Sequence, residues 1–151
     1  MAKSNNTLCL DKFYPERDLI ITDIAQQSDK IIIRMKSTSS SCKCPKCNHI
    51  TQKYHGTYTR KVQDLPILGK QVQLEICSHE YACLNDECEA VSIAETFDGF
   101  LNNYSRMTER CADFICTLAL ETSCEGCARV CRTLGIKTCL LYTSDAADDL
   151  T

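Results

Sequence analysis

The chain has 151 residues, a hydrophobic content of 44% and a formal net charge of -3, which suits one medium domain or two small ones. It has no run of about 18 apolar residues, and its start lacks the apolar core of a signal peptide, so we expect a cytoplasmic protein without a membrane helix. Its 13 cysteines are an odd number, and in a reducing compartment they favour metal binding or burial over a disulfide framework.

A β-hairpin is the first predicted element. Residues 1–17 are polar and mixed, which predicts a loose lead-in. Residues 19–24 and 30–36 are β-branched runs, and the sequence Gln26-Gln27-Ser28-Asp29 between them is typical of a turn. Residues 37–41 are rich in serine and predict a short flexible connection.

Two cysteine pairs then bracket a segment with strand periodicity. Residues 54–62 and 71–83 carry apolar side chains at every second position, which predicts two half-buried strands of a small antiparallel sheet. Pro66 and Gly69 mark the turn between them, which we expect over residues 65–69. Each cysteine pair would therefore lie beside a strand of this sheet.

Four of these cysteines have the spacing of a structural zinc site. A two-residue spacer, as in Cys44-Pro-Lys-Cys47, places two sulfur atoms on one metal in a tight turn, and Cys83 and Cys88 form the second pair. We expect one tetrahedral Zn²⁺ that holds a sheet too small to build its own core. Burial of the cysteines without metal is the weaker alternative. Other residues that could replace a ligand are Cys42, His49, His55 and His79.

The charge is distributed unevenly along the chain. Residues 30–70 carry nine Lys or Arg and one acid, whereas residues 71–98 carry seven acids and no Lys or Arg. A basic block of this density can contact phosphates, or the two blocks can neutralise each other across a sheet. The predicted nucleic-acid surface consists of Lys53, His55, Tyr58, Arg60, Lys61 and Lys70, and its alternative is a solvated sheet face.

Helical signals follow a connecting segment over residues 89–107, in which Phe97, Phe100 and Leu101 are expected to pack between the modules. Thr108 is a good N-cap for a first helix, and Ser123 and Gly135 suit the two ends of a second. The cysteines at 124, 127 and 131 fall on the apolar face of that second helix, which favours core packing over a second metal or iron–sulfur site. Two short helices and a tight turn predict a helix-turn-helix whose third, recognition helix would begin near residues 137–138.

Several short motifs follow one another along the chain. They are Cys44-Pro-x-Cys47, His55-x-x-Tyr58-x-Arg60, Asp64-Leu-Pro66 with Gly69, Tyr81-x-Cys83 with Cys88, Ala94-Glu95-x-Phe97 and Leu134-Gly135-Ile136. In this order they resemble the N-terminal region of the ISL-three family of insertion-sequence transposases. The resemblance covers residues 20–138, with Asn48 where a glycine commonly follows the first cysteine pair.

The resemblance implies a DNA-binding head that recognises the terminal inverted repeats of an insertion sequence and is nucleoid-associated. Strand cleavage would belong to a downstream RNase-H-like domain, and self-association to the full-length protein. Residues 139–149 are similar to a translated sequencing adapter, so we expect a truncated fragment whose native sequence stops near Thr138 and which is not itself an enzyme.

We therefore expect an α+β protein with four parts. They are an N-terminal segment with a hairpin (residues 1–36), a zinc-ribbon-like module (37–98), a partial helix-turn-helix (99–138) and a non-native tail (139–151). The alternative function is a zinc-ribbon module for protein interaction or transcription regulation, without direct contact to DNA.

Overall fold

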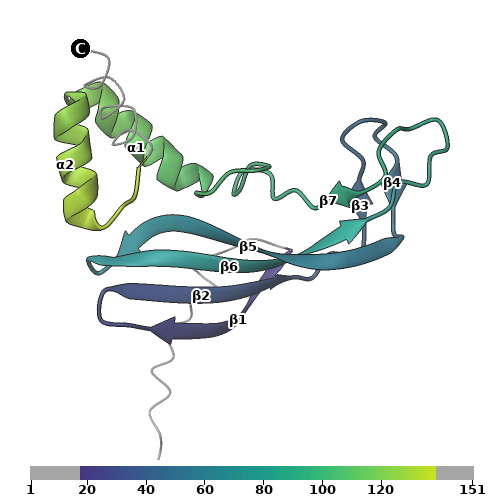
Figure 1. The fold of residues 1–151 in the computed structure, drawn as a ribbon, viewed down its shortest axis with the longest axis horizontal. Helices are drawn as coiled ribbons and strands as arrows, with labels where there is room; N and C mark the ends of the chain where they lie inside the picture. Colours follow the sequence, from purple (N-terminus) through teal and green to yellow (C-terminus); the bar gives the residue numbers. More distant parts are fainter. Residues whose placement is uncertain (1–17, 139–151) are drawn as a thin grey trace, which may run out of the picture.

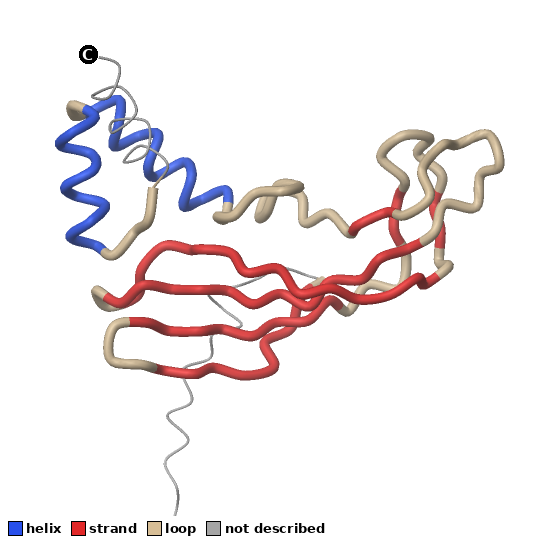
Figure 2. The backbone as a smooth tube through the Cα atoms, in the orientation of Figure 1, coloured by secondary structure: helices blue, strands red, loops and turns tan. Residues whose placement is uncertain are grey.

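The computed structural model describes residues 18–138, so the lead-in and the adapter-like tail expected from the sequence lie outside the described residues. A five-stranded sheet forms the middle of this region, a two-stranded sheet lies at one end of it, and two helices lie at the other end (Figure 1). Figure 2 shows the helices confined to that second end. The mixed α+β class predicted from the sequence is confirmed.

The predicted N-terminal hairpin is present. Strand β1 (Leu19–Gln26) pairs antiparallel with β2 (Lys30–Ser37). The register shifts by one residue between Ile21 and Asp23, where β1 contains a bulge. The hydroxyl of Thr22, the extra residue, donates a hydrogen bond to the Arg34 carbonyl at 3.2 Å.

The second hairpin is longer than predicted. Strand β5 (Tyr54–Ile67) pairs antiparallel with β6 (Lys70–Tyr81) and includes Leu65 and Pro66, where the sequence predicts a turn. These two residues have no partner in β6, because the register shifts between Asp64 and Ile67. The turn consists only of Leu68 and Gly69, both at positive φ (52° and 76°). Two positive φ angles match the twist of the flanking strands, which is why so short a loop can close the hairpin.

The two hairpins share one sheet through a parallel pairing that the sequence patterns do not predict. Strand β2 pairs with β6 over Lys30–Lys36 and Gln71–Cys77, giving the order β1-β2-β6-β5. After β2 the chain enters the two-stranded sheet of β3 (Cys42–Lys43) and β4 (Ile50–Thr51), returns along β5 and leaves again along β6. Strands β2 and β6 therefore both run toward the same end of the molecule, and a short β7 (Ile93–Ala94) pairs with the last residues of β6.

The core lies on one face of this sheet. Its strands contribute alternate apolar side chains, as strand periodicity requires, and the connecting segment contributes Phe97, Phe100 and Leu101. These three residues are buried in the core of the sheet, whereas the sequence predicts them between the modules. The fully buried or nearly buried strand residues are Leu19, Ile33, Met35, Val62, Val72, Leu74 and Ile76.

The two predicted helices are α1 (Glu109–Glu121) and α2 (Cys124–Leu134). The Thr108 hydroxyl accepts from the Cys111 N–H and the Ser123 hydroxyl from the Gly126 N–H, which confirms both N-caps. Gly135 ends α2 in the left-handed conformation with φ 79°. No helix within residues 18–138 is long and apolar enough to cross a membrane.

A separate small core joins the helices. Cys111, Ile115, Cys127, Cys131 and Ile136 are buried together there. Core packing is therefore confirmed for Cys127 and Cys131 but is wrong for Cys124, which is exposed. Cys124 follows directly on the two-residue connection at the tip of the helical pair, where α1 no longer covers α2.

Candidate metal centre and basic surface

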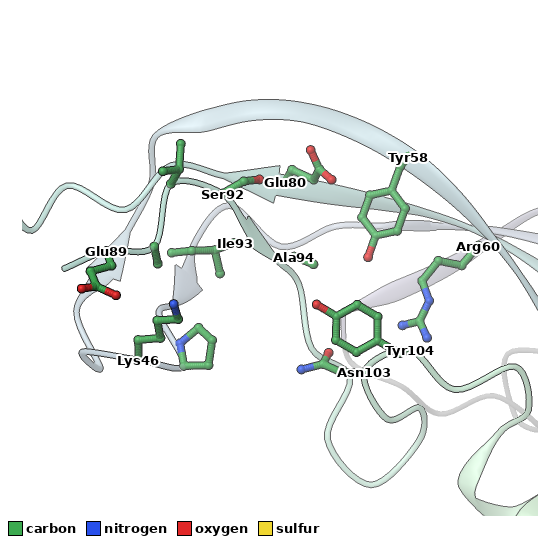
Figure 3. Close-up of a pocket in the computed structure, with 13 residues that line it drawn as sticks. Lys46, Tyr58, Arg60, Glu80, Glu89, Ser92, Ile93, Ala94, Asn103 and Tyr104 are labelled. Atoms are coloured by element: carbon green, nitrogen blue, oxygen red, sulfur yellow. The ribbon is translucent and has the colours of Figure 1, made fainter.

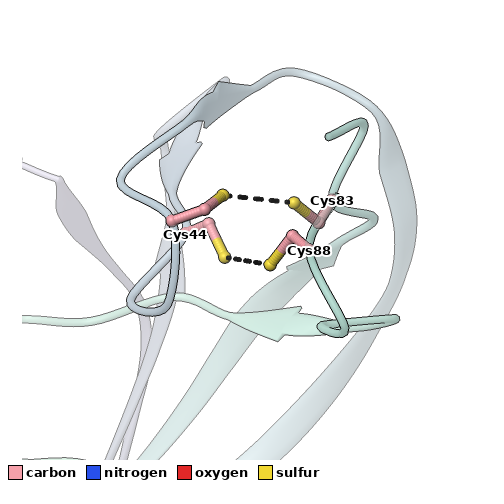
Figure 4. A group of neighbouring side chains, drawn as sticks. Cys44, Cys83 and Cys88 are labelled. Carbon is pink, nitrogen blue, oxygen red and sulfur yellow. Dashed lines mark hydrogen bonds between the residues drawn. The ribbon is translucent and has the colours of Figure 1, made fainter. Parts of the chain in front are cut away.

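The four cysteines at knuckle spacing meet at the end of the sheet where β2 and β6 both point. Each offers a sulfur atom, and all four sulfur atoms lie within 4.8 Å of one another. The Sγ atoms of Cys44 and Cys88 are 3.8 Å apart and those of Cys47 and Cys83 are 3.6 Å apart (Figure 4). Each short contact thus joins one residue of the first pair to one of the second.

These separations fit a metal better than a covalent bond. A tetrahedron with Zn–S bonds of about 2.3 Å has S···S edges of about 3.8 Å, whereas sulfur atoms in a disulfide are about 2.0 Å apart. All four cysteines are free thiols in the structure. The cluster is therefore consistent with a structural Zn²⁺.

Backbone geometry places the first pair. Cys44 follows β3, and its N–H donates to the His49 carbonyl at 2.9 Å while its carbonyl accepts from the Asn48 N–H at 2.9 Å. Asn48 has φ 60°, the left-handed conformation that glycine adopts most readily and asparagine tolerates. The departure from glycine at this position is therefore accommodated by the fold.

An Asx turn places the second pair. The side-chain oxygen of Asn85 accepts from the Glu87 N–H at 3.1 Å, and the Asn85 carbonyl accepts from the Cys88 N–H at 3.0 Å. The Ala90 N–H points at the Cys88 sulfur at 3.5 Å. Backbone N–H groups aimed at sulfur stabilise thiolates, the form that binds metal.

The thiols of the cluster differ in acidity. A hydrogen bond from the His49 N–H lowers the pKa of the Cys47 thiol to about 6. At Cys83 the Asn85 N–H favours the thiolate, but desolvation and the neighbouring thiols prevail and raise the pKa to about 12. One thiolate thus forms readily, whereas further negative charges need a cation beside them.

The alternative ligands named from the sequence lie outside the four-sulfur cluster. Cys42 is buried, and its sulfur contacts the carbonyls of Lys43 and Ala94 at 3.7 and 3.9 Å. His79 contacts the Ser39 carbonyl through Nδ1 at 3.1 Å. Among the described residues, the group that could hold a metal comprises Cys44, Cys47, Cys83 and Cys88 without any histidine.

The structure distributes the six predicted DNA-binding residues over several places. Lys53 and His55 are exposed near the cysteine cluster, where β5 begins. Tyr58 and Arg60 lie on the core face of the sheet, because they pair with Ser78 and Ile76, whereas Lys61 pairs with Glu75 on the opposite face. Lys70 lies at the far end and donates to the Gln27 carbonyl at 3.2 Å.

Tyr58 and Arg60 line a hollow of about 550 Å³ together with the exposed Tyr104 (Figure 3). The Arg60 guanidinium donates to the carbonyls of Asn102 and Ser105 at 3.0 and 2.9 Å. This arginine therefore ties the connecting segment to β5. The same hollow contains Glu80 and Glu89, so its charge is mixed.

The suggested neutralisation of the two charge blocks is limited. Of the nine basic residues in 30–70, Arg34 alone forms an ion pair among the described residues, with Asp23 at 2.6 Å and Glu75 at 3.1 Å. Strand β6 nevertheless lies between the more basic β2 and β5. The lysines of the block thus form no ion pair with a described residue.

Two buried carboxylates were not identified as site residues from the sequence. Asp64 accepts from the Thr108 hydroxyl at 2.7 Å, from Arg110 Nε at 2.9 Å and from the Leu65 N–H at 2.8 Å. It thereby ties β5 to the N-cap of α1. A lone acid at an inward-facing strand position was the signal that could have found it, because such a carboxylate needs partners.

Glu95 is the second buried carboxylate. It accepts from the Ser37 hydroxyl and from the His79 N–H, both at 2.7 Å. These bonds join the end of β2 to β6 just before the cysteine cluster. The motif residues Asp64 and Glu95 thus connect elements of the fold, a role distinct from catalysis.

Comparison with protein families agrees with the metal centre. Residues 40–88, about a third of the chain and including all four cysteines, match the family model described as the zinc-finger of transposase IS204/IS1001/IS1096/IS1165. No curated protein and no solved structure matches the chain. The matched domain is a zinc-finger and not a catalytic domain, which indicates a transposase-related module compatible with DNA binding.

Proposed function

We propose that this chain is the DNA-binding N-terminal part of a transposase and recognises the terminal inverted repeats of its insertion sequence. The zinc-finger match over residues 40–88, on a four-sulfur cluster of tetrahedral dimensions, carries the proposal. In it, Cys44, Cys47, Cys83 and Cys88 are the ligands of one structural Zn²⁺. The ion fixes the end of the sheet and takes no part in strand cleavage, which belongs to a catalytic domain outside this chain.

The helical pair would supply the second half of the binding unit. Helices α1 and α2 are joined by Thr122 and Ser123, and Gly135 ends α2 with a sharp change of direction. In the proposal, these two helices would be the part of a helix-turn-helix that precedes the recognition helix. The recognition helix would begin near residues 137–138 and belong to the native continuation of the protein. The six basic and aromatic residues from Lys53 to Lys70 would add contacts to phosphate and sugar.

Selection from a random DNA pool tests this function. The purified chain is mixed with a duplex library at low salt, and bound DNA is sequenced. We expect an enriched motif that occurs at both ends of the source element in inverted orientation. Absence of DNA binding at any salt concentration, or a motif unrelated to those ends, would overturn the proposal.

The alternative is a zinc-ribbon module that binds a protein partner. Salt separates the two functions, because each phosphate contact adds about 0.9 to the slope of log affinity against log salt. Binding to DNA with a steep slope supports the proposal. The alternative is favoured if the chain does not bind DNA but binds a partner protein with an affinity that depends little on salt.

A further inference from the structure

A second hollow, of about 400 Å³, lies where the helical end of the molecule meets the sheet. It opens between β5, β6 and the chain segments before α1 and after α2. Three of its lining residues are cationic and none of those described is acidic. The lining residues are Lys61, Gln63, Gln71, Gln73, Arg106, Met107, Lys137 and Thr138.

The position of the three cations is fixed by the backbone around them. Residues 106–108 extend the sheet beyond β5, because the Gln63 N–H donates to the Arg106 carbonyl and the Gln63 carbonyl accepts from the Thr108 N–H, both at 2.9 Å. The Gln63 side-chain amide in turn donates to the Lys137 carbonyl and accepts from the Lys137 N–H, both at 2.8 Å. One glutamine thus holds the segments that carry Arg106 and Lys137 beside β5.

No acidic residue in the described part of the chain pairs with these three cations. Lys61, Arg106 and Lys137 are exposed, and none of them forms an ion pair with a described residue. The acid nearest in register is Glu75, opposite Lys61, and it is engaged by Arg34 at 3.1 Å and by the Gln73 amide at 3.2 Å. In a chain with a net charge of -3, a hollow with three unpaired cations is a local feature and not a result of overall charge.

We infer that this hollow, through Lys61, Arg106 and Lys137, binds the phosphate backbone of DNA. The inference rests on the proposed function and locates its main electrostatic contact at the helical end, away from the zinc centre. Cations without an acidic partner suit phosphodiester oxygens, and the glutamine amides that line the hollow can donate hydrogen bonds to phosphate or sugar. Lys137 also lies where the chain leaves α2 toward the expected recognition helix, so phosphate contacts here would orient that helix on the duplex.

The test compares two triple variants of the full chain that lose the same charge. K61Q/R106Q/K137Q removes the cations of the hollow, and K36Q/K43Q/K46Q removes three exposed lysines elsewhere. Each protein is titrated into a short mixed-sequence DNA duplex labelled with fluorescein, and anisotropy gives the affinity at several salt concentrations. Zinc content and circular dichroism, equal in all proteins, show that folding is unchanged.

We expect the hollow variant to lose about tenfold or more in affinity at low salt and about 2–3 in the salt slope, since each lost phosphate contact removes about 0.9. The control variant should lose much less, and K61R/K137R, which keeps the charge, should bind like the parent. Equal losses in the two triple variants, with a parent that binds DNA, would overturn this inference alone. A parent that binds no DNA would overturn the proposed function as well.

Discussion

At the scale of single residues, Asp64 shows how a buried charge can organise a junction. Its carboxylate is 2% exposed and lies between the end of β5 and the start of α1. Burial raises its pKa, but hydrogen bonds from Arg110, Thr108 and the Leu65 N–H outweigh burial and hold the pKa below its ordinary value of 3.8. Thr108 is also the N-cap of α1, so one carboxylate supports both the helix start and its attachment to the sheet.

Asp64→Asn should therefore destabilise the fold by about 2 kcal/mol at pH 7. The amide keeps the shape of the side chain but cannot form the ion pair with Arg110, and the 40% exposure of the Arg110 side chain moderates the cost. Urea denaturation of both proteins measures the difference. Asp98→Asn, at an exposed acid of the connecting segment, is the control and should change stability by less than about 0.5 kcal/mol.

The same pair of proteins makes a prediction about pH. Because the pKa of Asp64 is lower in the folded state than its ordinary value, its stabilising effect is present above pH 3.8 and is lost as the pH falls below it. The stability difference between parent and Asp64→Asn should shrink in that acidic range. A difference independent of pH would show that the carboxylate charge does not contribute.

At the scale of elements, the β5–β6 hairpin has a turn residue that does not suit its conformation. Leu68 has φ 52° and the residue is 96% exposed. The steric cost of its left-handed conformation is therefore not offset by burial of the side chain. Leu68→Asn should raise the free energy of unfolding by about 0.5–1 kcal/mol, because Asn-Gly is the preferred pair for such a turn. Thermal denaturation followed by circular dichroism measures the gain.

Leu68→Ala is the matched control for this prediction. Alanine removes the exposed apolar side chain but meets the same steric cost at positive φ as leucine does. Its stability should therefore stay close to that of the parent. Equal gains for alanine and asparagine would attribute the effect to the exposed leucine and not to the backbone conformation.

Short sequence patterns predict most of the helices and strands but not which strands pair with one another. The caps at Thr108, Ser123 and Gly135 mark both helices correctly because capping depends only on residues a few positions away. The parallel pairing of β2 with β6 joins residues about forty positions apart, and no short motif records it. The turn predicted over residues 65–69 begins too early, because Pro66 lies within β5, the edge strand, where the register shifts.

Of the candidate site, the sequence predicts the cysteine cluster but not the arrangement of the basic residues. Cysteine spacing pointed to the four residues that meet in the structure, because each pair is placed by its own tight turn. The basic surface was less accessible to sequence reasoning, because charge density along the chain does not tell which face of a strand a residue occupies. Arg60 and Lys61 are neighbours in sequence, yet one holds a loop on the core face while the other borders the hollow on the opposite face.

At the scale of the whole molecule, the parallel strands explain how one metal can join distant parts of the chain. Since β2 and β6 run toward the same end, the cysteine pairs that follow them meet there, although they are separated by the whole of β5 and β6. The core of this end, around Cys44, Tyr81 and Ile93, is separate from the core of the sheet and from that of the helices. Metal should accordingly support one end of the molecule more than the others.

Loss of zinc should therefore loosen this end locally. Cys88→Ser removes a proposed ligand and should abolish the binding of one zinc ion, which native mass spectrometry measures, whereas Cys42→Ser, at a buried cysteine outside the cluster, should keep it. Hydrogen exchange in Cys88→Ser should rise in residues 42–51 and 83–94, where few strand pairs hold the chain. Amides of Ile33 and Leu74, at the centre of the sheet core, should stay protected. Uniform loss of protection would instead show that metal and sheet form one cooperative unit, and unchanged exchange would show that the metal is not structural.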